Sequence, residues 1–273
     1  MFPSIVDFGR VHLPVLGEVH LFLPTYGLLF AVGALFAWWW FSRRAAGMGL
    51  PKEPVFNLGF YSLLGGIVGA KLTLFVVEWR HYLAHPGDVL TSFRSAGVLM
   101  GGVAVGAGAF VFYARRHRLP VLPLADAIVA PLALAQALGR LGCFSAGCCY
   151  GTPTDAWFGV TFTNPDAYAQ TGVPLGVPLV PTQLLEAGGD LLIAALATFL
   201  WRRRDGRGDG AILAVYLVTY AILRATIEIW RGDEVRGVWF GGHVSTSQLL
   251  SALAVAVGVG LFAHARRPRA SGA

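Results

Sequence analysis

The sequence contains few charged residues, and this scarcity limits what kind of protein it can be. Of its 273 residues only 13% are charged, whereas 55% are hydrophobic, and the mean hydropathy is +0.61. A soluble chain this apolar would lack a polar surface. The composition therefore predicts an integral membrane protein.

Features of other protein classes are missing as well. No soluble domain, linker, low-complexity run or convincing repeat interrupts the chain, so we expect a single polytopic membrane domain over residues 1–273. The first twenty residues lack the pattern of a cleavable signal peptide. No GxSxG or HExxH motif and no serine and histidine pair is evident, which makes an intramembrane hydrolase a weak alternative.

Long apolar segments are present instead, each close to the ~20 residues that cross ~30 Å of hydrocarbon as a helix. We expect helices over residues 21–41, 55–77, 97–113, 124–141, 181–201, 211–230 and 244–263. The predicted fold class is an all-α integral membrane protein with about seven transmembrane helices.

The positions of the 21 Lys and Arg predict the orientation, because basic residues near helix ends are retained on the cytoplasmic side. Most lie in one set of alternate connections, namely at Arg43, Arg44, Lys52, Arg115, Arg116, Arg118, Arg202, Arg203, Arg204, Arg207, Arg266, Arg267 and Arg269. The other set holds only Arg10, Arg80, Arg94, Arg231 and Arg236. We therefore expect the N-terminus outside, the C-terminus in the cytoplasm, and an external loop or small cap over residues 150–180, with at most a short hairpin. The net charge of +6 reflects this topology, and no nucleic-acid partner is expected.

Charged residues fall inside the predicted helices, where a charge costs roughly 2.5 to 3.5 kcal/mol at the centre. They include Lys71, Arg140, Arg224, Glu186, Asp190 and Glu228. Helical spacing aligns Tyr220, Arg224, Glu228 and Arg231 on one face, and Gln183, Glu186 and Asp190 on another. Either these charges form buried ion pairs that fix helix packing, with Arg224 pairing to Glu228, or they line a polar cavity whose arginines recognise an anion such as phosphate.

Glycines recur in the second and third predicted helices, at Gly65, Gly66, Gly69, Gly101, Gly102, Gly106 and Gly108. Their GxxxG spacing favours close helix packing. The alternative is that Gly101 and Gly102 leave room for a ligand.

The segment AQALGRLGCFSAGCCYG, residues 135–151, combines an arginine, glycines and all three cysteines. It resembles the signature of the prolipoprotein diacylglyceryl transferase family of bacterial inner-membrane enzymes, which is close to GRxGNFxNxExxG. Arg140, Gly142, Phe144 and Gly151 fit that signature, whereas Cys143 replaces its asparagine and Cys148 its acidic residue.

Other segments resemble the same family in the same order, so the resemblance covers nearly the whole chain. LPTYGLLFAVG, GGIVGAKLTLF, VPTQLLE, YAILRATIEIWRGDE and STSQLLS resemble the family's WYGL, GGRxGYxLFY, HPSQLYE, YGxxRFxxExxRxPD and SMGQILS. The matching positions are Tyr26, Lys71 for an arginine, Pro181, Gln183, Glu186, Tyr220, Arg224, Glu228, Arg231 and Gln248, with Val180 replacing a histidine.

The resemblance implies transfer of the diacylglyceryl group of phosphatidylglycerol to the lipobox cysteine thiol of exported preprolipoproteins, at the outer leaflet of the bacterial inner membrane. We hypothesise that Arg140 and Arg224 hold the phosphate, that Glu228 orients Arg224, and that Tyr26 or Tyr220 binds the headgroup. The predicted substrate-binding residues are Lys71, Gly101, Gly102, Cys143, Gly151, Gln183, Glu186, Tyr220 and Arg231. Phosphatidylglycerol, lipobox peptides and membrane lipids are the expected partners, and no cofactor or metal is expected.

The base that activates the thiol is not evident. The family's GGMSFHGG segment contains a histidine, and SAGVLMGG has Met100 at that position. His81, His85 and His243 are candidates only in outer loops, where a solvated histidine is the commoner case. Either the thiol deprotonates in a positively charged cavity, or the chain is a diverged paralogue.

Cys143, Cys148 and Cys149 allow three interpretations. They are small packing residues, or Cys143 takes part in a disulfide in an oxidising compartment, or they bind a metal or carry out thiol chemistry. Their CxxxxCC spacing lacks the paired CxxC of a zinc site. The main alternative to the enzyme as a whole is a lipid-binding paralogue or a small-molecule transporter with the same charged cavity.

Overall fold

The computed structural model describes residues 3–13, 17–92, 97–204, 208–232, 238–239 and 244–265. Its contacts divide the chain into two compact units, residues 1–37 with 125–273 and residues 38–124. The prediction of one polytopic domain with a cap inserted at residues 150–180 stays a prediction.

The first unit begins with a β-hairpin that the sequence did not predict. Strand β1 (Ser4–Leu13) pairs antiparallel with β2 (Gly17–Pro24). The register shifts between Asp7 and Arg10, where Gly9 has a φ of 75°, as in a β-bulge. Helix α1 (Thr25–Ala46) follows directly and contributes its residues up to 37 to this unit. The helix expected from residue 21 therefore starts four residues later.

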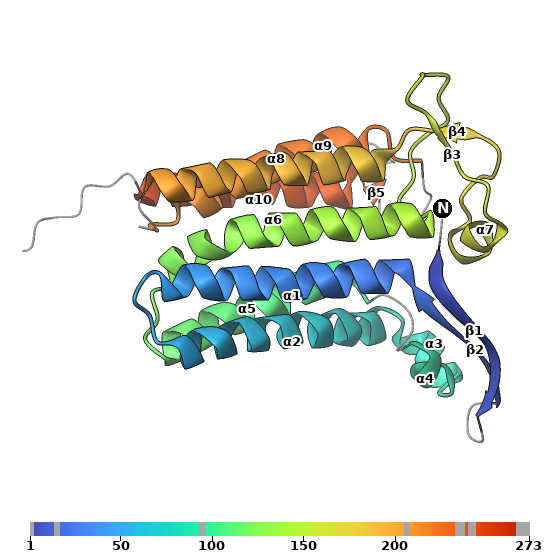
Figure 1. Cartoon of the computed structure of the whole chain (residues 1–273), viewed down its shortest axis with the longest axis horizontal. Helices are drawn as coiled ribbons and strands as arrows, with labels where there is room; N and C mark the ends of the chain where they lie inside the picture. Colours follow the sequence, from blue (N-terminus) through green and yellow to red (C-terminus); the bar gives the residue numbers. More distant parts are fainter. Residues whose placement is uncertain are drawn as a thin grey trace, which may run out of the picture. The chain divides into compact units, whose positions relative to one another are not determined.

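Four further long helices run alongside one another in the first unit (Figure 1). They are α6 (Val121–Ala146), α8 (Thr182–Arg203), α9 (Ala211–Glu228) and α10 (Thr246–Ala265). Helix α9 packs against both α8 and α10. Half of the apolar window of α6 is buried, against 11% for α10, because alanines such as Ala130, Ala133 and Ala137 let neighbouring helices approach closely. Helix α6 is thus the inner helix of the group.

A buried carboxylate on α6 caps the first turn of α9. Asp126 is fully buried, and its oxygens accept hydrogen bonds from the backbone N–H groups of Asp209 at 3.0 Å, Gly210 at 2.9 Å and Leu213 at 2.8 Å. Since Gly210 has no side chain with which to cap the helix, Asp126 supplies the acceptor and places a negative charge at the positive end of the helix dipole.

The segment between α6 and α8 folds into a small cap with its own core. It contains β3 (Val160–Thr161), α7 (Pro165–Thr171) and β4 (Pro178–Leu179), with β3 and β4 paired antiparallel. Its buried residues are Phe162, Ala167, Val173 and Leu179. The short hairpin agrees with the sequence prediction, whereas α7, capped by Asn164, was not predicted. Further along, β5 (Val238–Trp239) pairs with β6 (Val244–Ser245) just before α10.

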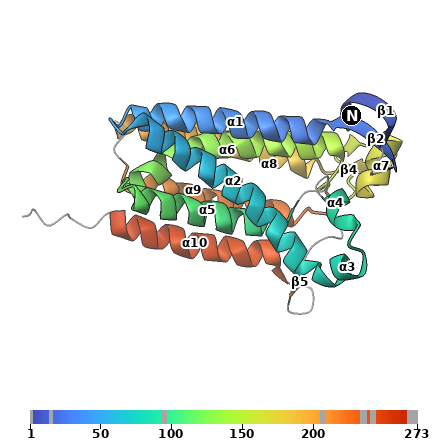
Figure 2. The same ribbon diagram turned by 90° about the horizontal axis from the view of Figure 1, so that it is seen from below.

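The second unit is built on a close pair of helices, α2 (Lys52–Val77) and α5 (Leu99–Arg116), which cross in Figure 2. The shorter α3 (Trp79–Ala84) and α4 (Asp88–Ser92) lie between them in the chain. A Cβ added at Gly102 would come within 2.8 Å of the Gly66 carbonyl oxygen, and one at Gly106 within 3.1 Å of the Ser62 carbonyl oxygen. These glycines therefore serve close packing, as their spacing predicted.

Among the described residues, six helices are long and apolar enough to cross a membrane, namely α1, α2, α6, α8, α9 and α10. This confirms the all-α membrane class, with one helix fewer in that group than the sequence predicted. The remaining segment, residues 97–113, does form a helix, α5, but its 18 residues end in Arg115 and Arg116. A seventh crossing by α5 stays a prediction.

Candidate functional site

Four charged side chains from α6, α8 and α9, two buried acids and two partly buried arginines, form one network in the first unit. Arg140 Nη2 lies 2.7 Å from Glu186 Oε1, and Arg224 Nη2 lies 2.8 Å from Glu228 Oε2. Arg224 Nε lies 3.9 Å from the same Glu186 oxygen. The side chains of Glu186 and Glu228 are 2% and 4% exposed, and those of Arg140 and Arg224 are 17% and 15% exposed. The acids are therefore buried, while both arginine side chains are partly exposed.

One donor of this network has no acceptor in the part of the chain that the structure describes. The Nη1 atom of Arg224 is buried and has no hydrogen-bond partner among the described residues. Because an unpaired donor on a buried guanidinium is costly, the position favours an anion as its partner.

Asp190 extends the polar face of α8 one turn beyond Glu186. It is fully buried, and neither carboxyl oxygen has a hydrogen-bond partner within the described ranges. Glu186 and Arg140 are near enough to act on it electrostatically. The polar stripe predicted for this helix is thus turned inward.

Two stacked tyrosines of α9 line the same region. The rings of Tyr216 and Tyr220 are 5.7 Å apart, and the Tyr216 hydroxyl donates to Gln136 Oε1 at 2.8 Å. Tyr220 lies within electrostatic range of Glu186 and Arg140. Gln136 and Tyr216 were not predicted as site residues, although each lies four residues before a predicted site residue and therefore on the same helical face.

Tyr26 reaches the site from the start of α1. A Cβ added at Gly142 would lie 3.0 Å from Tyr26 Cδ2 and 3.1 Å from Tyr26 Cα, so the glycine lets the two helices touch. Tyr26 is within electrostatic range of Arg140 and of Cys143. The first unit therefore brings all four predicted catalytic residues, Tyr26, Arg140, Arg224 and Glu228, into one region.

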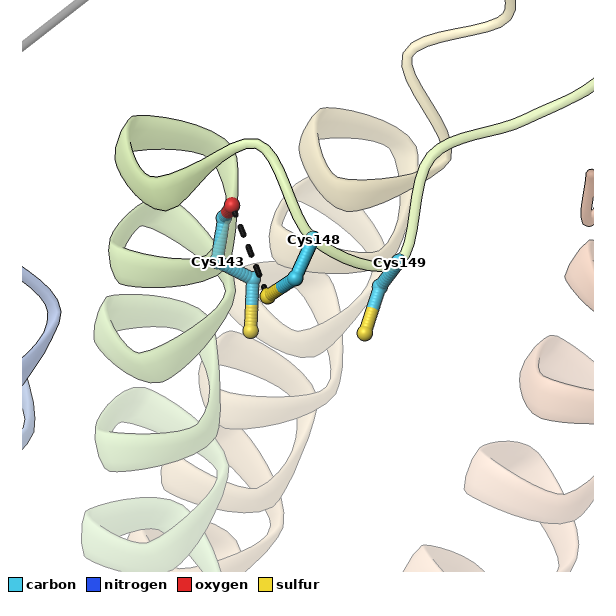
Figure 3. Close-up of side chains that lie close together, drawn as sticks. All are labelled: Cys143, Cys148 and Cys149. Atoms are coloured by element: carbon cyan, nitrogen blue, oxygen red, sulfur yellow. Dashed lines mark hydrogen bonds between the residues drawn. The ribbon is translucent and has the colours of Figure 1, made fainter. Parts of the chain in front are cut away.

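The three cysteines meet where α6 ends (Figure 3). The N–H groups of Gly147 and Cys148 both donate to the Cys143 carbonyl, at 2.9 and 3.1 Å, which turns the chain back over the helix end. Gly147 has a φ of 82° and Cys149 a φ of 62°. A left-handed backbone is uncommon for a residue with a Cβ, and here it brings Cys149 back beside the other two cysteines.

Two residues at the start of α8 hold this turn. Gln183 Nε2 donates to the Cys148 carbonyl at 2.8 Å, and Thr182 Oγ1 donates to the Cys149 carbonyl at 2.7 Å. Gln183 was predicted as a substrate-binding residue. Its side chain here holds the backbone of the loop that carries Cys148 and Cys149.

The surroundings of Cys149 favour its thiolate. Hydrogen bonds from the Cys143 and Cys148 thiols, and then the positive charges of Arg231 and Arg140, hold the pKa of Cys149 well below its usual range against the effect of burial. The thiol pKa of Cys148 is raised, chiefly by its hydrogen bond to Cys143.

Gly151 and Arg231 join the cap to the end of α9. They form an antiparallel bridge, and a Cβ at Gly151 would meet the Val180 side chain and the Trp230 carbonyl at 2.7 and 2.9 Å. Arg231 is only 8% exposed. The absence of a side chain at Gly151 is therefore required by packing.

The other predicted residues belong to the second unit. Lys71 Nζ donates to the Ser92 carbonyl at 2.6 Å, and Gly101 and Gly102 pack against α2. Met100 lies in the first turn of α5. His81 bonds Asp88 at 3.0 Å and stacks on His85, and His243 lies outside the described residues.

The family model for prolipoprotein diacylglyceryl transferase matches residues 14–264. The chain belongs to the prolipoprotein diacylglyceryl transferase family. It is therefore a transferase by family, as the sequence resemblance predicted.

Relatives match along nearly their whole length. The phosphatidylglycerol–prolipoprotein diacylglyceryl transferase of Clostridium tetani is 33% identical over 250 residues, which cover 91% of this chain and 96% of the relative. Transferase 2 of Clostridium perfringens is also 33% identical, over 91% of this chain and 93% of its own length. The Synechococcus elongatus enzyme is 31% identical over 94% of this chain and 85% of its own.

Proposed function

We propose that the chain transfers the diacylglyceryl group of phosphatidylglycerol to the lipobox cysteine thiol of exported preprolipoproteins. The family membership and the names of its relatives support the reaction. The observation that carries it at the level of residues is the pair of largely buried arginines that share Glu186. In the described part of the chain, the Nη1 donor of Arg224 has no hydrogen-bond partner.

The chemistry that this site must perform is substitution at a carbon that bears a phosphate ester. The acceptor sulfur attacks the glyceryl carbon as a thiolate, a C–S bond forms, and the C–O bond breaks with its electron pair on the departing glycerol phosphate. Arg140 and Arg224 would bind the phosphate and stabilise the charge that develops on its ester oxygen. Glu228 holds Arg224, and Glu186 holds Arg140, through the ion pairs described above.

The remaining predicted site residues divide between binding and positioning. Tyr26 and Tyr220, which both lie within electrostatic range of Arg140, would hydrogen-bond the headgroup, and Arg231 adds positive charge near the cysteines. Gln183 and Gly151 shape the loop after α6. Binding of lipid or peptide by Lys71, Gly101, Gly102 and Cys143 also belongs to this proposal.

The protein is a multi-pass membrane protein, and we place it in the bacterial inner membrane with its site toward the outer leaflet. The basic residues at Arg202, Arg203 and Arg204, at the other end of α8 from Gln183, support this orientation. Phosphatidylglycerol and the lipobox peptide would then meet beside the cap.

The test is a reconstituted transfer reaction. The purified full-length chain in phosphatidylglycerol vesicles, incubated with a lipobox peptide, should yield a diacylglyceryl thioether detectable by mass spectrometry. Arg140→Ala and Arg224→Ala should each reduce the rate at least about a hundredfold. The matched control is Arg204→Ala, which removes an exposed ion pair in which Arg204 Nη1 lies 2.6 Å from Asp209 Oδ1. It should leave the rate of transfer unchanged.

Two results would contradict the assignment. Near-normal transfer by well-folded Arg140→Ala or Arg224→Ala would remove the arginines from the reaction. Binding of the lipid without turnover by the unaltered chain would favour the alternative, a non-catalytic lipid-binding paralogue.

A further inference from the structure

The three thiols form a close group, and phosphate binding does not require them to lie so close together. The sulfur atoms of Cys143, Cys148 and Cys149 all lie within 4.8 Å of one another. Three sulfurs bound to one tetrahedral Zn²⁺, at Zn–S distances of about 2.3 Å, are about 3.8 Å apart. Small side-chain rotations would therefore bring the three sulfurs around a single ion.

We propose that Cys143, Cys148 and Cys149 bind a Zn²⁺ ion as thiolates, and that its fourth coordination position takes the acceptor thiol. The second half of the proposal rests on the proposed transfer reaction. Catalytic zinc sites keep three protein ligands and an open fourth position, and a thiol that coordinates the ion is deprotonated. The ion would supply the activation for which Met100 offers no base.

The backbone holds the three sulfurs in place from two sides. The turn at Gly147 and the left-handed conformation of Cys149 return the chain toward Cys143, and Figure 3 shows the three side chains grouped beside the helix end. Gln183 and Thr182 hold the carbonyls of Cys148 and Cys149. An observed backbone outlier of this kind is a reason to look for a function, and a preformed ligand set reduces the ordering needed on binding.

The fold also brings together cysteines whose spacing in the sequence is not typical of a zinc site. CxxxxCC lacks two CxxC pairs, but the turn after α6 brings Cys148 back until its Sγ lies 3.7 Å from the Cys143 carbonyl oxygen. Sulfur ligands suit a thiophilic ion such as Zn²⁺ in preference to Mg²⁺ or Ca²⁺. All three cysteines are free.

The surrounding charges suit the complex that would form. Three thiolates and Zn²⁺ carry a net charge of −1, and a bound acceptor thiolate makes it −2. Arg140 and Arg231 both act electrostatically on Cys149, so both favour negative charge at this position. Cys148 and Cys149 are partly exposed, which leaves a side from which a peptide can approach.

The transfer step balances without an oxidant or a reductant. The acceptor thiol coordinates Zn²⁺ and releases its proton to water. Its sulfur then forms the C–S bond to the glyceryl carbon, the C–O bond breaks, and the electron pair leaves on glycerol phosphate. The thioether that forms is a weaker ligand than a thiolate, so the product can dissociate from the ion.

The first measurement concerns the metal alone. The full-length protein, purified in detergent with a phosphine reductant, should bind one Zn²⁺ per chain by elemental analysis. Replacement by Co²⁺ should give a thiolate-to-cobalt charge-transfer band. Cys143→Ser, Cys148→Ser and Cys149→Ser should each weaken Zn²⁺ binding by at least about tenfold.

Two control variants separate this site from other effects. Ser145→Ala lies on the same helix turn and removes only a hydroxyl that donates to the Leu141 carbonyl at 3.0 Å, so it should bind Zn²⁺ like the unaltered chain. His81→Ala breaks up the exposed group of His81, His85 and Asp88, whose ligand atoms also lie within 4.8 Å of one another. It should leave the charge-transfer band intact.

The second measurement uses the acceptor. A lipobox peptide with cysteine should intensify the charge-transfer band of the Co²⁺ protein, and the same peptide with serine should not. Reduced protein that binds no Zn²⁺, a Co²⁺ spectrum without the band, or a spectrum indifferent to the cysteine peptide would overturn the proposal.

The outcomes also separate this proposal from the transfer function. Unchanged thioether formation after metal removal and in Cys149→Ser would reject the zinc site and leave the transferase intact. A Co²⁺ band that responds to the peptide thiol, without any thioether product, would keep the site and reject the transferase.

Discussion

At the scale of single residues, Glu186 is the acid on which Arg140 and Arg224 converge. Its Oε1 atom lies 2.7 Å from Arg140 Nη2 and 3.9 Å from Arg224 Nε, and its side chain is 2% exposed. In a buried ion pair the loss of one partner leaves the other charge uncompensated, which is far more costly than the net worth of the pair. Glu186 therefore matters for stability as well as for the orientation of Arg140.

Glu186→Gln should lower the free energy of unfolding by roughly 3 to 5 kcal/mol, because two guanidinium groups lose their shared acid. Arg204→Met, which breaks an exposed pair, should cost no more than about 1 kcal/mol. Denaturant unfolding in detergent, followed by tryptophan fluorescence, would compare the two. Equal effects would mean that the Glu186 network does not hold the helices together.

Gly151→Ala should destabilise the junction between the cap and α9. The new Cβ would press on the Val180 carbonyl and side chain and on the Trp230 carbonyl, and backbone atoms cannot move aside cheaply. Gly188→Ala is the matched control, because a Cβ there meets nothing within 4 Å, and it should stabilise α8 by about 0.5 to 1 kcal/mol. Thermal unfolding of both variants would test this difference, which vanishes if Gly151 has room for a side chain.

At the scale of the secondary-structure elements, α9 depends on a residue outside its own segment. Its first turn is capped by Asp126, which lies more than 80 residues earlier in the chain. Sequence patterns can detect a capping residue that directly precedes its helix, and Asn164 precedes α7 in this way. They cannot detect a cap that only tertiary packing brings to the helix end.

Asp126→Ala should cost about 2 kcal/mol, because three backbone donors lose a charged acceptor in a buried place. Hydrogen exchange of the amides at Gly210 and Leu213 should quicken more than exchange elsewhere in α9. Asn164→Ala, which removes one exposed bond of 2.8 Å to the Asp166 amide, should have a smaller effect. Unaltered exchange at Gly210 in Asp126→Ala would contradict the proposed capping.

At the scale of the whole molecule, the sequence predicted the helices better than the connections between them. Apolar length alone located α2, α8 and α10 to within a few residues, because the bilayer dictates that length. The N-terminal hairpin and α7 carry no such constraint. Helical spacing predicted the ion pair of Arg224 and Glu228. The convergence of Cys148 and Cys149 on Cys143 depends instead on a backbone turn, which the periodicity of the sequence does not predict.

The proposed orientation predicts where reporter fusions are active. Alkaline phosphatase, which needs an oxidising compartment, should be active when fused after Trp157 in the cap, a side chain that is 95% exposed. It should be inactive when fused after Arg204, since the preceding arginines keep that end of α8 in the cytoplasm. A green fluorescent protein fused at Arg204 should fluoresce. The reverse pattern would invert the topology.

The two ends of α6 are fastened to its neighbours by polar bonds, Asp126 to the start of α9 and Arg140 to Glu186 of α8. At 1.5 Å per residue these anchors are about 21 Å apart. A helix held at two such points can neither slide like a piston nor rotate about its axis without breaking a buried bond. In this unit the three helices α6, α8 and α9 therefore act as a fixed frame, and entry of a lipid tail or a peptide must be achieved by movement of other elements.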